Sequence, residues 1–205
     1  MRRPFLALLT TSAIALTSAC ALAYDAPATT LDKTTSGTYA IDPSHTNVLF
    51  SLSHMGFSHY YGRFNKVDGS LTFDAKAPEK SKLSVTVDVA SIDTNNEKLQ
   101  GELKSAQWFD AAKFPTATFT STKIEKLSAT KGKVTGDFTL HGVTKPVTLD
   151  VTFNGTGINP IANSEELGFS AKGTIKRSEF GITQYVPMVG DDVTLTIETE
   201  LHLKK

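Results

Sequence analysis

Five histidines are the side chains of this sequence that ordinarily titrate near neutral pH, so they are its first candidates for acid–base or metal chemistry. They are His45, His54, His59, His141 and His202. No H-x-x-x-H or H-E-x-x-H pair occurs among them, and they are dispersed over different predicted strands and loops. The spacing therefore predicts no metal site. His54 falls on the predicted inward face of a strand, where two interpretations stay open: a hydrogen-bonded structural histidine, or contact with the head group of a ligand.

The motifs of nucleophilic and nucleotide-dependent enzymes are absent from the sequence. It contains no G-x-S-x-G, no Ser-x-x-Lys with its partner motifs, no G-x-G-x-x-G and no phosphate-binding loop. Carboxylates such as Asp88, Asp137 and Asp150 fall on predicted outward faces, where solvation explains them. The only cysteine is Cys20. We therefore predict a protein that is not an enzyme and that holds no metal and no resident cofactor.

Alternation of apolar and polar residues is the dominant pattern from about residue 37 onward, and it is the signature of strands with one solvent-exposed face. The alternating segments lie at 39–41, 48–54, 71–73, 83–89, 117–121, 134–140, 147–153, 169–175 and 193–203. They indicate about eight strands with short connections. Closure is favoured because pairing the first strand with the last removes exposed edges. The predicted fold class is all-β, an eight-stranded antiparallel barrel with one or two short helices.

One segment, 95–110, departs from this alternation. It follows Thr94-Asn95-Asn96-Glu97, which has the form of a capping box, and Leu99, Leu103 and Ala106 follow at helical spacing. The segment predicts one or two short helices that cover the barrel.

The interior of an eight-stranded barrel is just wide enough to be filled by its own side chains or to hold one ligand. Small and large residues alternate on the predicted inward face: Ala117, Ser121, Gly136, Ala171 and Gly173 are small, whereas Phe50, Phe73, Phe119, Phe138, Phe153 and Phe169 are large. Small residues beside aromatic walls suit a hydrophobic tunnel. Glycines can equally mark bulges while phenylalanines interlock in a solid core. The pattern alone leaves a hollow and a solid barrel open.

The first residues have the form of an export signal. Arg2 and Arg3 precede an apolar run that is short for a membrane span and ends in Ala21-Leu22-Ala23. We predict a signal peptide at 1–23, a flexible leader at 24–36 and a barrel domain at 37–205. An alternative is a lipid anchor on Cys20, because Thr17-Ser18-Ala19-Cys20 resembles a lipoprotein cleavage box.

The charge of the exported chain excludes one class of partner. Loss of residues 1–23 would remove two of the 21 basic side chains and none of the 21 acidic ones, which leaves 19 against 21 and a net charge of about −2. Such a chain has no field to attract nucleic acid, so no nucleic-acid partner is expected.

Several motifs, in order and spacing, resemble the YceI family. They are Tyr39-Ala40-Ile41-Asp42-Pro43-Ser44-His45, Gly62-Arg63-Phe64, Trp108-Phe109-Asp110, 114–119, 134–147, Arg177-Ser178-Glu179-Phe180-Gly181-Ile182 and 189–193. The resemblance covers about residues 38–201. It implies a lipocalin-like extended barrel in the periplasm that binds a polyisoprenoid or a similar long-chain amphiphile in its interior. It also makes a homodimer plausible, because the family contains dimers.

We therefore expect a periplasmic carrier for a polyisoprenoid such as a quinone or a polyprenyl phosphate. The residues expected along the hydrophobic tail are Phe50, Leu52, Phe119, Phe138, Phe153, Phe169 and Ile175. His54 or Arg177 is expected at a mouth, as a hydrogen-bond donor to the polar head, since arginine suits phosphate geometry. The alternative is a stress-related or interaction protein whose solid barrel acts through its surface or through a dimer interface.

Overall fold

The computed structural model describes residues 26–204, so the predicted signal peptide and Cys20 lie outside the described residues. The strands are β1 (Gly37–Ile41), β2 (Asn47–His54), β3 (Ser58–Phe64), β4 (Val67–Phe73), β5 (Lys82–Asp88), β6 (Ile92–Asp93), β7 (Thr116–Lys126), β8 (Lys131–Leu140), β9 (Val143–Asn159), β10 (Ser164–Lys176) and β11 (Asp192–Leu203). The α-helix is α1 (Glu97–Lys104), and the 3-10 turns are η1 (Leu31–Lys33), η2 (Pro78–Lys80), η3 (Val89–Ser91) and η4 (Arg177–Phe180). From residue 26 to 204, no helix has the length and apolar character needed to cross a membrane.

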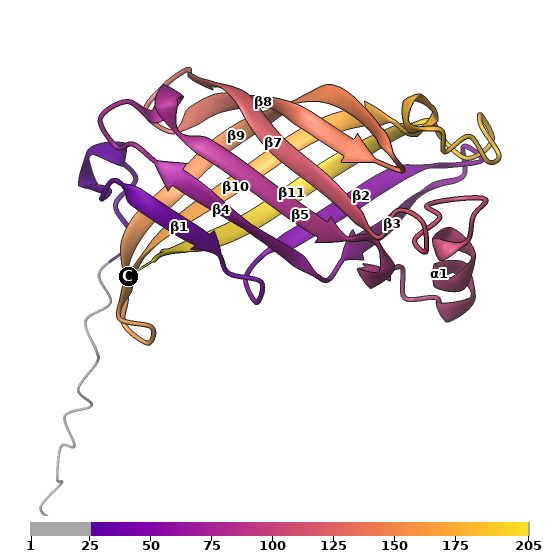
Figure 1. The fold of residues 1–205 in the computed structure, drawn as a ribbon, viewed down its shortest axis with the longest axis horizontal. Coiled ribbons are helices and arrows are strands. Elements are labelled where there is room, and N and C mark those ends of the chain that lie inside the picture. The colour runs from indigo at the N-terminus through magenta and orange to yellow at the C-terminus, as the bar shows by residue number, and fades with distance from the viewer. Residues whose placement is uncertain (1–25, 205) are drawn as a thin grey trace, which may run out of the picture.

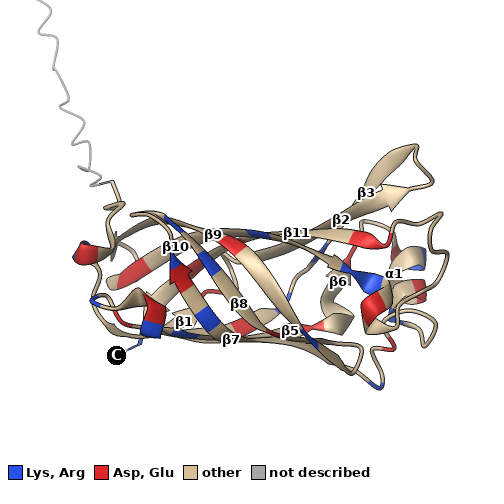
Figure 2. Cartoon of the chain, turned by 90° about the horizontal axis from the view of Figure 1, so that it is seen from above, with Lys and Arg blue, Asp and Glu red and all other residues tan. Residues whose placement is uncertain are grey.

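Eight strands close into an antiparallel barrel (Figure 1). Their order is β1-β4-β5-β7-β8-β9-β10-β11, and the ring closes because β1 also pairs with β11 through Tyr39 and Leu203. The buried residues of the strands are mostly apolar, and Figure 2 shows charged residues distributed along the strands and on α1. The predicted fold class, an eight-stranded antiparallel barrel with a short helix, is confirmed.

The remaining strands, β2, β3 and β6, lie beside the ring. β2 pairs with β11 only from Asn47 to Ser51. β1 occupies the C-terminal end of β11, and β11 begins at Asp192, two residues before the partner of Ser51. Beyond that point the β2–β3 hairpin runs past the barrel and projects from it (Figure 2). The strand β3 was not recognised from the sequence, since exposed Tyr61 interrupts any clear apolar face.

The predicted helical segment contains one α-helix followed by turns. Its N-cap is Asn96, whose side chain accepts a hydrogen bond from the backbone N–H of Leu99 at 3.1 Å. The N-cap therefore lies two residues after the predicted Thr94, which donates its hydroxyl hydrogen to the carbonyl of Asn96 instead of capping the helix. Buried Leu103 anchors the helix at one end of the barrel, as its predicted apolar stripe requires.

The segment before β1, expected as a flexible leader, makes specific contacts from Ala28 onward. Ala28 exchanges two backbone hydrogen bonds with Thr156 of β9, each 2.8 Å long. Thr35 donates its N–H to Glu165, while its carbonyl accepts from the hydroxyl of Tyr39 at 2.7 Å. Burial acts to raise the pKa of Glu165, but the hydrogen bonds from Thr35 and Thr156 outweigh it and hold the pKa below its ordinary value. Residues 28–36 thus cover the ends of β9 and β10.

The two ends of the barrel differ, and this difference positions the site. At the α1 end, α1, η4 and the loop 182–191 pack over the barrel around Trp108 and Phe180. At the opposite end, called here the β7–β8 end, lie η1, η2 and the turns that join β7 to β8 and β9 to β10 (Figure 1).

Candidate ligand-binding cavity

The barrel encloses a cavity of about 320 Å³ whose wall is almost wholly apolar. All eight barrel strands contribute to the wall, together with β2 and β3. The lining runs the length of the barrel, from Leu31 and Ser81 at the β7–β8 end to Trp108 and Arg177 at the α1 end. Its volume is at the lower end of the range of about 300–1,000 Å³ found for small-molecule sites. Of the two possibilities left open by the sequence, the structure shows the hollow barrel.

Eight of the nine predicted site residues line this cavity. They are Phe50, Leu52, Phe119, Phe138, Phe153, Phe169, Ile175 and Arg177. Strand alternation placed the seven strand residues among them correctly, because inward positions of a closed barrel must converge on its axis. Arg177 belongs to η4 and had been expected at a mouth as a donor to the head group. Their contact with a ligand stays a prediction.

Two glycines that the sequence analysis placed on the inward face, Gly136 and Gly173, are covered by side chains of neighbouring strands and are not open gaps in the wall. A Cβ on Gly136 would stand 2.5 Å from the ring of Phe119, and a Cβ on Gly173 would stand 2.6 Å from Leu149. The ring of Phe50 covers Gly62 in the same way, because a Cβ on Gly62 would stand 2.3 Å from this ring. The glycines let these side chains lie against neighbouring strands, and the axis of the barrel stays open as a result.

His54 does not line the cavity, although strand alternation predicted that it points inward. It is exposed, and its backbone forms a bridge with Val189. The pairing of β2 with β11 ends at Ser51, Leu52 is the last residue of β2 that lines the cavity, and His54 lies beyond it on the part of β2 that runs past the barrel. A head-group role for His54 therefore has no support from its position.

Arg177 lies at the α1 end of the cavity and is only 5% exposed. Its guanidinium donates to three backbone carbonyls: Nε to Gly190 at 2.9 Å, Nη1 to Ile182 at 3.0 Å and Nη2 to Val189 at 2.7 Å. Three of its five N–H groups are thus committed to holding the loop 182–190, and two remain. Burial lowers the pKa of Arg177, and nearby Asp191 partly offsets this effect.

Trp108 and its neighbours close the α1 end, and the sequence analysis did not assign them to the site. Trp108, Leu103 and Ile182 are all buried and all line the cavity. The Trp108 ring lies 5.5 Å from the Arg177 guanidinium carbon and 6.0 Å from the ring of Tyr185. The sequence signal that could have revealed them was the apolar spacing of the segment 95–110. That spacing was interpreted only as a helix that covers the end of the barrel, not as part of the cavity wall.

Polar residues line the cavity at the β7–β8 end. They belong to the turn between β7 and β8 and to the adjoining strand ends, and they include the exposed side chains Lys126, Ser128 and Lys131. Lys131 donates from Nζ to the hydroxyl of Thr152 at 2.7 Å. Because the lining is buried at the α1 end and exposed here, the cavity meets solvent at the β7–β8 end, which we call the mouth.

Within residues 26–204, no three His, Cys, Asp or Glu side chains converge closely enough to hold a metal ion.

The fold and the cavity together define a hollow antiparallel barrel with an apolar interior. A model of the YceI-like domain matches residues 39–201. The chain belongs to the YceI family, as its motifs predicted.

Known relatives are similar to this protein over most of its length. It is 42% identical over 164 residues to Protein YceI of Salmonella arizonae, and the matched region covers 79% of this chain and 85% of the relative. The crystal structure of the Campylobacter jejuni YceI protein superposes with a TM-score of 0.68 at 35% identity, covering 75% of this chain and 90% of that one. A polyisoprenoid binding domain from Saccharophagus degradans, implicated in plant cell wall breakdown, has a TM-score of 0.60 over 81% of this chain and 98% of that domain. At 15% identity, that last likeness shows the fold alone.

Proposed function

We propose that this protein is a periplasmic carrier that holds a polyisoprenoid, or a similar long-chain amphiphile, in its barrel. The observation that carries the proposal is the apolar cavity that runs from the mouth to Trp108. A long narrow apolar space suits a flexible hydrocarbon chain, since burial stabilises the complex by about 25 cal/mol per Å² of apolar surface. A polar ligand would lose its hydrogen bonds to water there without replacement.

One protein with this fold is named for the same class of ligand. The Saccharophagus degradans domain with this fold is named for polyisoprenoid binding. The cavity also favours a carrier over the alternative of a solid barrel that acts only through its surface.

We place the polar head of the ligand at the mouth. The exposed ammonium groups of Lys126 and Lys131 lie on its rim, and lysine is a common partner of phosphate. The previously expected donors are less suitable, because His54 lies outside the cavity and Arg177 already binds three carbonyls. A quinone or a polyprenyl phosphate would then extend its tail toward Trp108.

The proposed location rests on the export signal at residues 1–23. Removal of this signal would release the barrel into the periplasm, whereas lipidation of Cys20 would keep it attached to a membrane. We also retain the proposals that the protein has no catalytic activity and that it can form a homodimer.

Trp108 provides the test, because it is the only tryptophan in the sequence and lines the closed end of the cavity. Titration of delipidated protein with a polyprenyl phosphate should change its fluorescence in a saturable way. The Trp108→Phe variant should lose the signal but still retain the lipid in a filtration assay. The proposed function would be contradicted if the fluorescence does not respond to the added lipid and the parent protein also retains no lipid in the filtration assay.

A further inference from the structure

We propose that the β7–β8 end of the barrel docks on a lipid bilayer, so that the mouth of the cavity faces the membrane. The proposal builds on the proposed function, because long-chain isoprenoids reside in bilayers. Docking can be measured on vesicles without any ligand, so the two proposals can fail separately.

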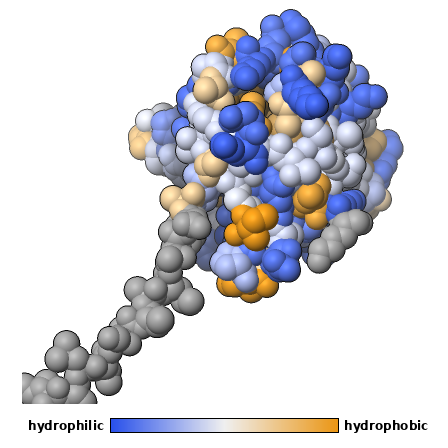
Figure 3. Space-filling model, turned by 90° about the vertical axis from the view of Figure 1, so that its left-hand side faces the viewer, coloured by the Kyte–Doolittle hydropathy of each residue, from blue (hydrophilic) through white to orange (hydrophobic). Residues whose placement is uncertain are grey.

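Exposed aliphatic side chains stand on two turns at this end. Leu127, between β7 and β8, is 60% exposed, and Ile158 and Ile161, at the turn between β9 and β10, are 66% and 95% exposed. The two turns lie at different edges of the same end (Figure 1), and Figure 3 shows hydrophobic residues among hydrophilic ones on this face. Side chains of this kind are buried when a protein settles into the boundary between head groups and acyl chains.

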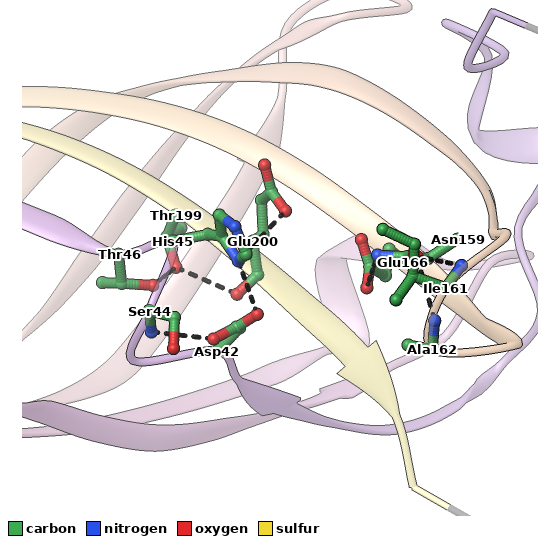
Figure 4. Close-up of polar contacts among 10 residues, drawn as sticks. All are labelled: Asp42, Ser44, His45, Thr46, Asn159, Ile161, Ala162, Glu166, Thr199 and Glu200. Carbon is green, nitrogen blue, oxygen red and sulfur yellow. Dashed lines mark hydrogen bonds and ion pairs between the residues drawn. The ribbon is translucent and has the colours of Figure 1, made fainter. Parts of the chain in front are cut away.

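The turn that carries Ile161 does not need the isoleucine side chain for its own structure. The side-chain oxygen of Asn159 accepts from the backbone N–H groups of Ile161 at 2.8 Å and Ala162 at 3.1 Å, and its amide donates to Glu166 (Figure 4). Polar contacts of Asn159 therefore fix the turn, and the Ile161 side chain is left pointing into solvent. An exposed apolar group with no structural role is available for a partner surface.

The charge of the β7–β8 hairpin suits an anionic bilayer. Residues 123–133 contain four lysines and one acidic residue, Glu125. Lys123 pairs with Glu125 at 2.8 Å and Lys133 pairs with Asp150 at 2.6 Å. Lys126 and Lys131, on the rim of the mouth, form no ion pair within 4 Å among residues 26–204, although the charge of Lys126 helps to lower the pKa of nearby Asp32 in η1. Each such lysine near an anionic surface strengthens binding by about fivefold.

The attachment of the N-terminal segment points to the same end. Ala28, near the start of the described residues, pairs with Thr156 of β9, three residues before the end of that strand at the β9–β10 turn. A lipid anchor on Cys20, the alternative read from the sequence, would tether this end to the membrane. The mouth, the basic rim and the lipid anchor would then all face the membrane.

A second apolar surface, at the α1 end, is the competing docking site. It consists of Met55, Phe57, Tyr61, Tyr185 and Met188. The cavity is closed at that end by buried Trp108 and Ile182, so docking there would not present the mouth to the bilayer. Phe57, which is 88% exposed, provides a matched control for Ile161.

The experiment is vesicle flotation with the processed protein purified from its own periplasm. Vesicles of phosphatidylethanolamine with phosphatidylglycerol are compared with vesicles of phosphatidylcholine alone. The variants are Leu127→Ser combined with Ile161→Ser, Lys126→Gln, and the control Phe57→Ser. Unchanged thermal unfolding of each variant shows that the barrel is intact.

We expect the parent protein to float with the anionic vesicles and to be released by added salt. Leu127→Ser with Ile161→Ser should lower the partition coefficient tenfold or more, and Lys126→Gln should lower it by about fivefold, whereas Phe57→Ser should not change it. The proposal is overturned if the parent protein binds neither kind of vesicle. It is also overturned if Phe57→Ser abolishes binding while the double variant still floats, or if the double variant changes only the oligomeric state measured by sedimentation.

Discussion

Replacement of Gly62 by alanine tests how the cavity wall is built. Gly62 of β3 lies opposite Phe50 of β2, and a Cβ at this position would stand 2.3 Å from Phe50 Cζ and 2.8 Å from Cε1. Carbon atoms normally approach only to about 3.5–4.0 Å, so the ring must swing toward the cavity. Overpacking of this kind costs about 1–3 kcal/mol. Each kcal/mol lowers the unfolding temperature of a domain of this size by about 2–4 °C, so we expect a decrease of about 2–12 °C.

The assay is thermal unfolding followed by circular dichroism, with two companion variants. Nothing lies within 4 Å of a Cβ on Gly101 in α1, so Gly101→Ala should instead stabilise the protein by about 0.5–1 kcal/mol. Addition of Gly62→Ala to a Phe50→Leu background should cost less than addition to the parent, because the ring is gone. If Gly62→Ala unfolds at or above the parent temperature, the ring of Phe50 does not cover Gly62 and the account of the wall is wrong.

Three further predictions follow from the cavity and its surroundings. Ala171→Trp should abolish lipid retention with the fold kept, and a variant that still retains lipid would contradict a ligand along this wall. Arg177→Met should lower the free energy of unfolding, measured by urea denaturation, by about 3 kcal/mol or more, because three backbone carbonyls lose a charged donor. A decrease of less than about 1 kcal/mol would contradict that role of Arg177. The hydrogen bond to Asp42, 2.7 Å long (Figure 4), raises the pKa of His45, so the stability from this pair is present below the ordinary histidine pKa and is lost as the pH rises through the raised value. In an NMR titration, Asp42→Asn should return the pKa of His45 toward its ordinary value, and an unchanged pKa would refute the assignment.

Strand alternation was sufficient to predict the barrel and most of its lining. Phe153 and Phe169 face inward as expected, with ring centroids 5.4 Å apart, because the side chains of a closed sheet alternate strictly between its two faces. The same rule failed at His54, where the alternation of β2 continues but the pairing with β11 has ended. Where a strand leaves its neighbour depends on the length of the neighbour, and the sequence of β2 does not contain that information.

The shape of the interior could not be predicted, because it depends on register. Gly136 is covered by Phe119 from the neighbouring strand, and the contact exists only because the register of β7 and β8 brings the ring over it. Trp108 was missed as a lining residue for a similar reason, since the segment after α1 must fold back over the barrel end before its side chain reaches the cavity. Contacts between elements distant in sequence decide these positions.

The central claim is that the barrel carries a long hydrophobic ligand, and native mass spectrometry of the protein purified from its own periplasm tests it most directly. We predict a mass above that of the chain alone, and organic extraction should release one stoichiometric isoprenoid lipid. A protein that shows only the bare chain mass, and that takes up no added polyprenyl lipid, would contradict the claim.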